Sequence, residues 1–168
     1  MWIPDCKGGK MRKKSKYRPK NVRTDNLNWI LAGMKKVGTL PKAGVSLKLK
    51  NHEALDELLM GKANRDHIDV LIAAFNIAEA LYCINPNLGA DWKAEIKKAQ
   101  DAIHTLGKRC LDRPTFACNS EEREALRTGM EIHDAQLDEC SVKEMEYALY
   151  FVAEVIRQKK ARPILETA

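Results

Sequence analysis

The sequence predicts an all-α fold: a compact antiparallel bundle of four long and two short helices around a central apolar helix, with a basic flexible N-terminal arm. The central helix is the segment 64–85, which is apolar over most of its circumference. Its few strongly polar side chains fall on one narrow stripe, formed by Arg65, Asp69, Asn76 and Glu79. Such a helix needs neighbours on several sides, because a single contact would leave much of its apolar surface in water. The second observation is that apolar residues recur at helical spacing in most of the other segments.

A first helix is expected before the central one. Thr24 or Asp25 can cap a helix that runs to about Lys36 and ends at Gly38 and Pro41. Its apolar side consists of Leu27, Ile30, Leu31, Met34 and Val37.

The segment 45–50 alternates apolar and basic residues, which is the pattern of a short β-strand. No second strand is evident, and an isolated strand has no ladder of hydrogen bonds, so we expect an extended connector. Its apolar side chains, Val45, Leu47 and Leu49, would pack on the helices. A short helix at 52–60, capped by Asn51, would follow it.

Two more helices follow the central helix, which Asn64 caps and the Asn85-Pro86 turn ends. The first begins near Asp91 and has a regular apolar stripe made of Trp92, Ile96, Ala99, Ile103, Leu106 and Cys110. The second is capped by Asn119 or Ser120, and its inward stripe is Leu126, Met130, His133 and Leu137.

The last helix has the strongest local signal in the chain. Ser141 and Glu144 match a capping box, in which the hydroxyl and the carboxylate each accept a hydrogen bond from an amide of the first turn. Its expected core residues are Met145, Ala148, Leu149, Val152, Val155 and Ile156. Basic residues and Pro163 mark its C-terminal end.

Length and composition favour one folded domain, 25–165, preceded by the arm, 1–24. No apolar run of about 18 residues is free of charge, and no apolar segment follows the basic residues of the N-terminus. We therefore expect a cytoplasmic protein that neither spans nor binds a membrane. The five cysteines are odd in number and widely spaced, with no C-x-x-C pair, which favours free thiols over a zinc or redox site.

The excess positive charge is confined to the first 25 residues. They contain nine Lys or Arg against two Asp, whereas the rest of the chain has 20 basic and 21 acidic residues and is nearly neutral. The segment has two prolines, a Gly-Gly pair and few apolar residues, so it is expected to be disordered until it binds something. Met11 precedes its densest basic run, and translation starts either there or at Met1.

A basic arm of this kind can bind DNA or RNA. Lysine and arginine neutralise phosphates, and a tyrosine can stack on an exposed base. The candidate nucleic-acid-binding residues are Arg12, Lys13, Lys14, Lys16, Tyr17, Arg18, Lys20 and Arg23. The same charge also suits an acidic protein surface, or a purely solubilising role, since charge alone does not read a base sequence.

The sequence offers little catalytic chemistry. It lacks the common nucleotide-binding, zinc-protease and serine-hydrolase motifs, so we assign no catalytic residue, no metal site and no cofactor. His133, next to Asp134, is interpreted as a core histidine that donates to a carbonyl or carboxylate. Asp101 and His104 could share a metal, but a solvated helix face is favoured. His52 and His67 have no partner at metal-site spacing.

The last helix also suggests a protein interface. Its side away from the core stripe has tyrosines and an arginine, a composition that is enriched in protein interfaces. The candidate interface residues are Tyr147, Tyr150, Phe151 and Arg157.

Three stretches carry a resemblance: 14–36, GKANRDHIDVLIAAFNIAEAL and EIHDAQLDECSVKEMEYAL. They resemble small helical proteins of tailed bacteriophages and prophages, over most of the chain from Met11 onward. The resemblance implies a protein that acts in the host cell by binding a host or phage component, such as transcription machinery, defence systems or nucleic acid.

Two functions are therefore expected. The first is a non-enzymatic accessory or regulatory protein that binds a host or phage protein, with the arm assisting. The second is an accessory protein that binds nucleic acid mainly through its arm. Self-association is compatible with either function.

Overall fold

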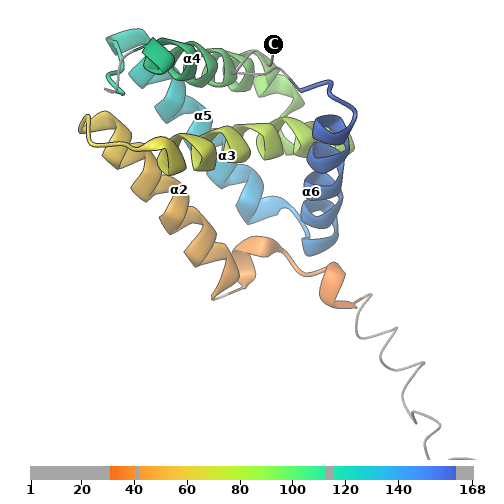
Figure 1. Ribbon diagram of the computed structural model, residues 1–168. Coiled ribbons are helices and arrows are strands. Elements are labelled where there is room, and N and C mark those ends of the chain that lie inside the picture. Colours follow the sequence, from red (N-terminus) through yellow and green to blue (C-terminus); the bar gives the residue numbers. More distant parts are fainter. Residues whose placement is uncertain (1–30, 41, 113–115, 162–168) are drawn as a thin grey trace, which may run out of the picture. The chain divides into compact units, whose positions relative to one another are not determined.

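The computed structural model describes residues 31–40, 42–112 and 116–161 (Figure 1). Within these ranges the chain forms five long α-helices and short 3-10 helices, and it contains no β-strand. The all-α bundle expected from the sequence is thus confirmed. The basic arm and the residues before Leu31 lie outside the described ranges.

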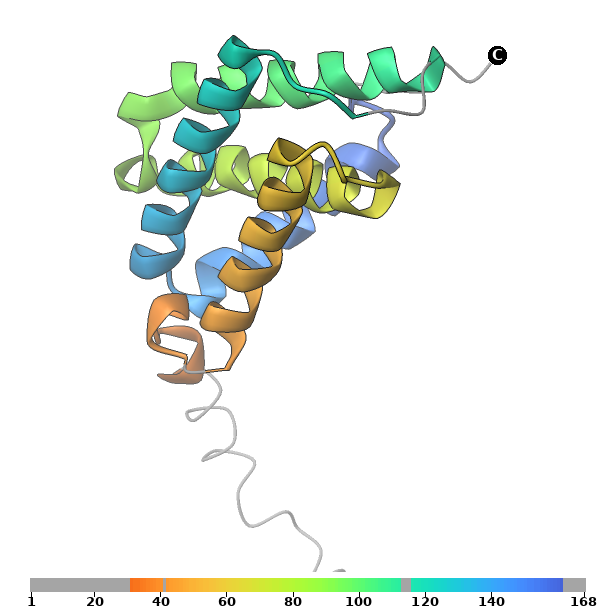
Figure 2. The same cartoon turned by 90° about the vertical axis from the view of Figure 1, so that its left-hand side faces the viewer.

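Helix α3 (Arg65–Ile84) is the centre of the bundle. It packs against the four other long helices, which are α2 (Ala43–Leu59), α4 (Lys93–Asp112), α5 (Ser120–Glu139) and α6 (Val142–Arg157). Figures 1 and 2 both show α4 running alongside α3. By length and hydropathy alone α3 would qualify as a membrane span, but its surroundings are those of a core helix.

The caps of these helices follow the sequence signals. Asn64 accepts a hydrogen bond from the backbone of His67, and Asn119 and Ser141 do the same for the residues three positions later. In all three cases the side chain of the third residue accepts a hydrogen bond from the backbone N–H of the cap residue, which completes a capping box. The starts of α3, α5 and α6 are therefore fixed by local sequence.

One apolar core joins α2, α3, α4 and α5. Its fully buried side chains include Leu58, Phe75, Leu106, Leu126 and Met130. A second cluster lies towards α6 and contains Val37, Leu81, Leu137, Cys140 and Ala148. The inward stripe expected for α5 is buried throughout, and that of α4 is buried from Ile96 to Leu106, with Cys110 partly buried. Trp92, expected to begin the α4 stripe, is exposed because it lies in a 3-10 turn (Ala90–Trp92) before that helix.

The first helix expected from the sequence ends earlier than Lys36. Residues 31–33 are helical, and Lys36 instead forms an antiparallel bridge with Ser141. The amide of Val37 donates to the carbonyl of Cys140 at 2.9 Å, and Lys36 Nζ lies 2.6 Å from Glu139. The backbone of residues 35–37 forms hydrogen bonds with the turn between α5 and α6, and these take the place of the hydrogen bonds that a longer helix would form. Leu31 and Met34, expected on the core side, are exposed.

The extended connector expected at 45–50 was a wrong prediction, and the helix expected at 52–60 is present but begins earlier. Both segments belong to one 17-residue helix, α2. Val45 and Leu49 are exposed and only Leu47 is half-buried, so the alternating pattern does not mark a buried face. Asn51 caps nothing; it is buried in the middle of α2. The long helices are consequently five in the described chain, where four were expected.

Candidate functional site

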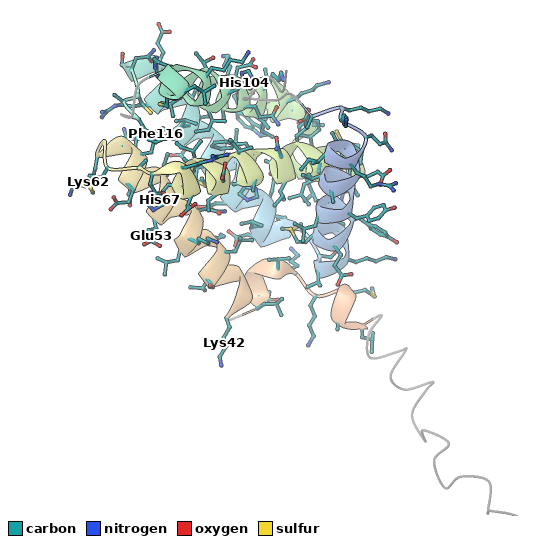
Figure 3. The ribbon with its side chains drawn as sticks, in the orientation of Figure 1. Lys42, Glu53, Lys62, His67, His104 and Phe116 are labelled. Carbon is teal, nitrogen blue, oxygen red and sulfur yellow. The ribbon has the colours of Figure 1, made fainter. Side chains whose placement is uncertain are left out.

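Helix α6 presents an unusually apolar outer surface, which we call the α6 surface. Its side chains are Tyr147 (54% exposed), Leu149 (51%), Tyr150 (69%), Phe151 (44%) and Ile156 (57%). Among the other described residues, exposed large apolar side chains are scattered over several elements. Figure 3 shows side chains projecting from α6 away from the other helices. An exposed apolar cluster of this kind is typical of a protein-binding surface.

Leu149 and Ile156 were expected in the core, and this prediction was wrong. Helix α6 buries only Met145 and Ala148, with Val152 and Val155 half-buried. Its principal helical neighbour is α3, so a single contact covers one side of α6 and leaves both flanks of its apolar stripe in solvent. The interface residues expected from the sequence, Tyr147, Tyr150 and Phe151, are exposed as anticipated.

Two contacts of charged side chains lie on the α6 surface, one near each end of the helix. Arg157 donates from Nε and Nη2 to Glu154 at 3.0 and 2.7 Å. Hydrogen bonds from Arg157 and then Gln158 lower the pKa of Glu154, which keeps its carboxylate ionised. Nearer the start of α6, Lys143 Nζ lies 5.7 Å from the centre of the Tyr147 ring, which is within cation–π range.

A groove of about 410 Å³ lies between α3, α4 and the C-terminal half of α6. Its apolar walls are formed by Ile72, Phe75, Ile103, Phe151, Val152, Val155 and Ile156. Phe151 and Ile156 therefore belong both to the α6 surface and to the groove. The groove is large enough to accept one or two side chains of a binding partner.

Part of the polar stripe of the central helix lines this groove. Asn76 and Glu79 both line it, together with Gln100 from α4. Gln100 Nε2 donates to Glu79 at 2.8 Å and lies 3.3 Å from the side-chain oxygen of Asn76. Asn76 and Glu79 therefore lie at a partly solvated groove, where Gln100 of α4 supplies a polar partner.

His104 also lines the groove and is buried, so the solvated face expected for it was a wrong interpretation. It lies on α4, whereas His67 lies at the start of α3 (Figure 3). His67 takes part in the capping box of α3, since the Asn64 amide donates to its Nδ1 at 3.2 Å. No group of three or more His, Cys, Asp or Glu in the described ranges is arranged to hold a metal ion.

Two further histidines, His52 and His133, differ in their hydrogen bonding. His52 on α2 lies 2.6 Å from Asp134, a pair separated by 82 positions that spacing could not reveal. His133 is completely buried, as expected. Neither ring nitrogen, however, makes a hydrogen bond of good geometry within the described residues, so the expected donation to a carbonyl or carboxylate is not seen, although the Gln136 side chain acts to raise the pKa of the ring. Burial lowers the pKa of His133 to about 4, so the ring is neutral at pH 7.

The remaining site predictions lie outside the described ranges. They are the eight arm residues from Arg12 to Arg23. Comparison with protein-family models, with curated proteins and with solved structures found no match to this chain.

Proposed function

We propose that this protein is a non-enzymatic binding module that acts on a host or phage protein through the α6 surface, with the basic arm assisting. The observation that carries the proposal is the cluster of exposed aromatic and aliphatic side chains on α6 beside an apolar groove. Tyrosine, phenylalanine and arginine on one helix face form the composition of an interface centre. The resemblance to small phage proteins supplies the class of partner.

The groove suggests how a partner would be held. A partner side chain inserted between Phe151 and Ile72 would lose its contact with water, while Tyr147 would cover the contact from outside. Anchors that fill a pocket and are shielded from water contribute most of the affinity of a protein interface. We therefore assign the largest share of the binding energy to Phe151 and Tyr147.

The test is capture of a partner from host cells, followed by a binding measurement with the purified pair. Tyr147→Ala combined with Phe151→Ala should weaken binding at least about 30-fold, which corresponds to roughly 2 kcal/mol. Trp92→Ala is the matched control, because Trp92 is equally exposed but lies next to α5, outside the groove. If the double variant bound the partner with unchanged affinity, or if the control lost as much affinity, the assignment of the site to α6 would be contradicted.

A second function is favoured by the confinement of excess positive charge to residues 1–25. In this alternative the protein is a nucleic-acid-binding accessory protein, and the arm contacts the phosphate backbone of DNA or RNA. Its affinity should fall by about 10³ or more between 50 and 200 mM salt, because each neutralised phosphate releases counterions. Deletion of residues 1–23 should abolish it.

The two functions are distinguished by treating the host-cell extract with nuclease before a partner is captured. A stoichiometric protein that is retained after nuclease treatment, and after deletion of residues 1–23, supports the binding module. Recovery that disappears with either treatment supports the nucleic-acid function and contradicts the first proposal.

A further inference from the structure

One row of residues on α6, which shares Tyr150 with the α6 surface, has a symmetry that the proposed function does not require. Glu146, Tyr150, Ala153 and Arg157 follow one another at steps of four, three and four positions, so they lie in line along the helix. All four are exposed. We call this row the outer stripe, and Leu149 and Ile156 border it on one side.

The outer stripe is complementary to itself when it is reversed. Its two ends are an acid, Glu146, and a base, Arg157. Its two inner positions are a large aromatic residue, Tyr150, and a small one, Ala153. In an antiparallel pair of identical helices, a two-fold axis between positions 151 and 152 brings Glu146 opposite Arg157 and Tyr150 opposite Ala153. Each pairing then occurs twice.

We propose that α6 pairs with the α6 of a second copy of this chain, antiparallel and in this register, to form a two-fold dimer. The Tyr150 ring would pack over Ala153 of the other chain, and the apolar contact would extend to Leu149 and Ile156, both more than half exposed in one chain. Arg157 binds Glu154 through Nε and Nη2, and its guanidinium has further N–H donors for the opposite Glu146.

The charges determine the orientation. A parallel pair in register would place Glu146 against Glu146 and Arg157 against Arg157, so repulsion at both ends disfavours it. Within one helix the two charges are 11 positions apart, or about 16 Å, which is too far for direct contact. Compensation between these two residues can therefore arise only between chains.

The dimer goes beyond the proposed function and does not depend on it. Phe151 projects roughly 130° around the helix from the centre of the outer stripe, so the Phe151 side of the groove stays open in the pair, and the dimer covers only the Ile156 edge. A captured partner could bind each copy of the dimer. Failure of the Phe151 and Tyr147 test would leave the dimer standing, and failure of the dimer would leave the partner site standing.

The experiment is sedimentation of the full-length, nuclease-treated chain over a range of concentrations. We expect the wild type to form dimers at micromolar concentrations, and Ala153→Lys to weaken dimerisation at least about tenfold by placing a charged side chain against Tyr150. Ala94→Lys on the exposed face of α4 is the matched control and should dimerise normally. A wild type that remains monomeric up to about 200 μM would overturn the proposal.

Charge reversal tests the register. Glu146→Arg alone should weaken dimerisation, because it places two arginines opposite each other at both ends. Combining it with Arg157→Glu should restore most of the wild-type affinity. A dimer that tolerates the single reversal, or a double reversal no better than the single one, would overturn the antiparallel pairing.

Discussion

His133 illustrates how a single buried residue sets a property of the whole protein. The ring has no solvent exposure and makes no hydrogen bond of good geometry within the described residues, so charging it inside the core is unfavourable. Burial lowers its pKa to about 4, and the nearby Gln136 and Asp134 only partly oppose this effect. In an unfolded chain the same ring would titrate at its ordinary value of about 6.5.

This difference predicts acid sensitivity. Between pH 6.5 and 4 the unfolded chain binds a proton at His133 that the folded chain does not, so stability from this residue is complete above pH 6.5 and falls as the pH decreases. The loss by pH 4 is on the order of 3 kcal/mol. Chemical unfolding of the wild type and of His133→Leu at several pH values measures it. The variant should lose less stability on acidification, and parallel pH profiles would contradict the assignment.

At the residue scale, sequence reasoning placed the buried positions of α5 correctly and misplaced several at the edges. Leu126, Met130, His133 and Leu137 are all buried because α5 is covered along its length. His104 was misplaced because its burial depends on the helices that pack beside α4, which spacing within α4 does not encode.

At the scale of elements, Gly129 marks the closest approach of α5 to its neighbours. A Cβ atom there would lie 2.5 Å from the Cβ of Ala99 on α4 and 3.0 Å from Cε1 of Phe75 on α3. Both distances are shorter than ordinary van der Waals contacts. The absence of a side chain at Gly129 lets these three helices pack as tightly as they do.

Gly129→Ala should therefore destabilise the protein although alanine favours helices by about 1 kcal/mol over glycine. Overpacking costs typically about 1–3 kcal/mol, which exceeds this gain on average, so we expect a net loss of about 1 kcal/mol. This corresponds to a decrease of about 2–4 °C in Tm by thermal unfolding. Gly33→Ala is the control, because its Cβ would meet Lys143 at an ordinary 3.5 Å. A Gly129→Ala protein more stable than wild type would contradict this packing.

The elements were predicted as well as their local signals allowed. Capping boxes and turns identify the starts of α3, α5 and α6, since side-chain and backbone groups three positions apart form them. Helix α2 was missed in its first half because Lys42 gives no side-chain cap and six residues happen to alternate. Because the described structure has no strand beside this segment, packing of α2 against α3 and α5 favours a helix over a strand there.

For the whole molecule, the central position of α3 follows from its sequence, because only a helix with several neighbours can bury an apolar surface that broad. The groove beside α6 could not be predicted, since it depends on α6 resting on α3 while its C-terminal half stays apart from α4. Asn76 and Glu79 were the available signal, because polar side chains on a core helix indicate a side that is not packed against an apolar surface.

The central claim is that the α6 surface and its groove form the partner-binding site. Hydrogen–deuterium exchange of the full-length chain, with and without a captured protein partner, tests it most directly. The claim predicts slower exchange in α6 and in the groove-facing parts of α3 and α4, with α2 unchanged. Protection limited to residues 1–25, with α6 exchanging as in the free protein, would contradict it.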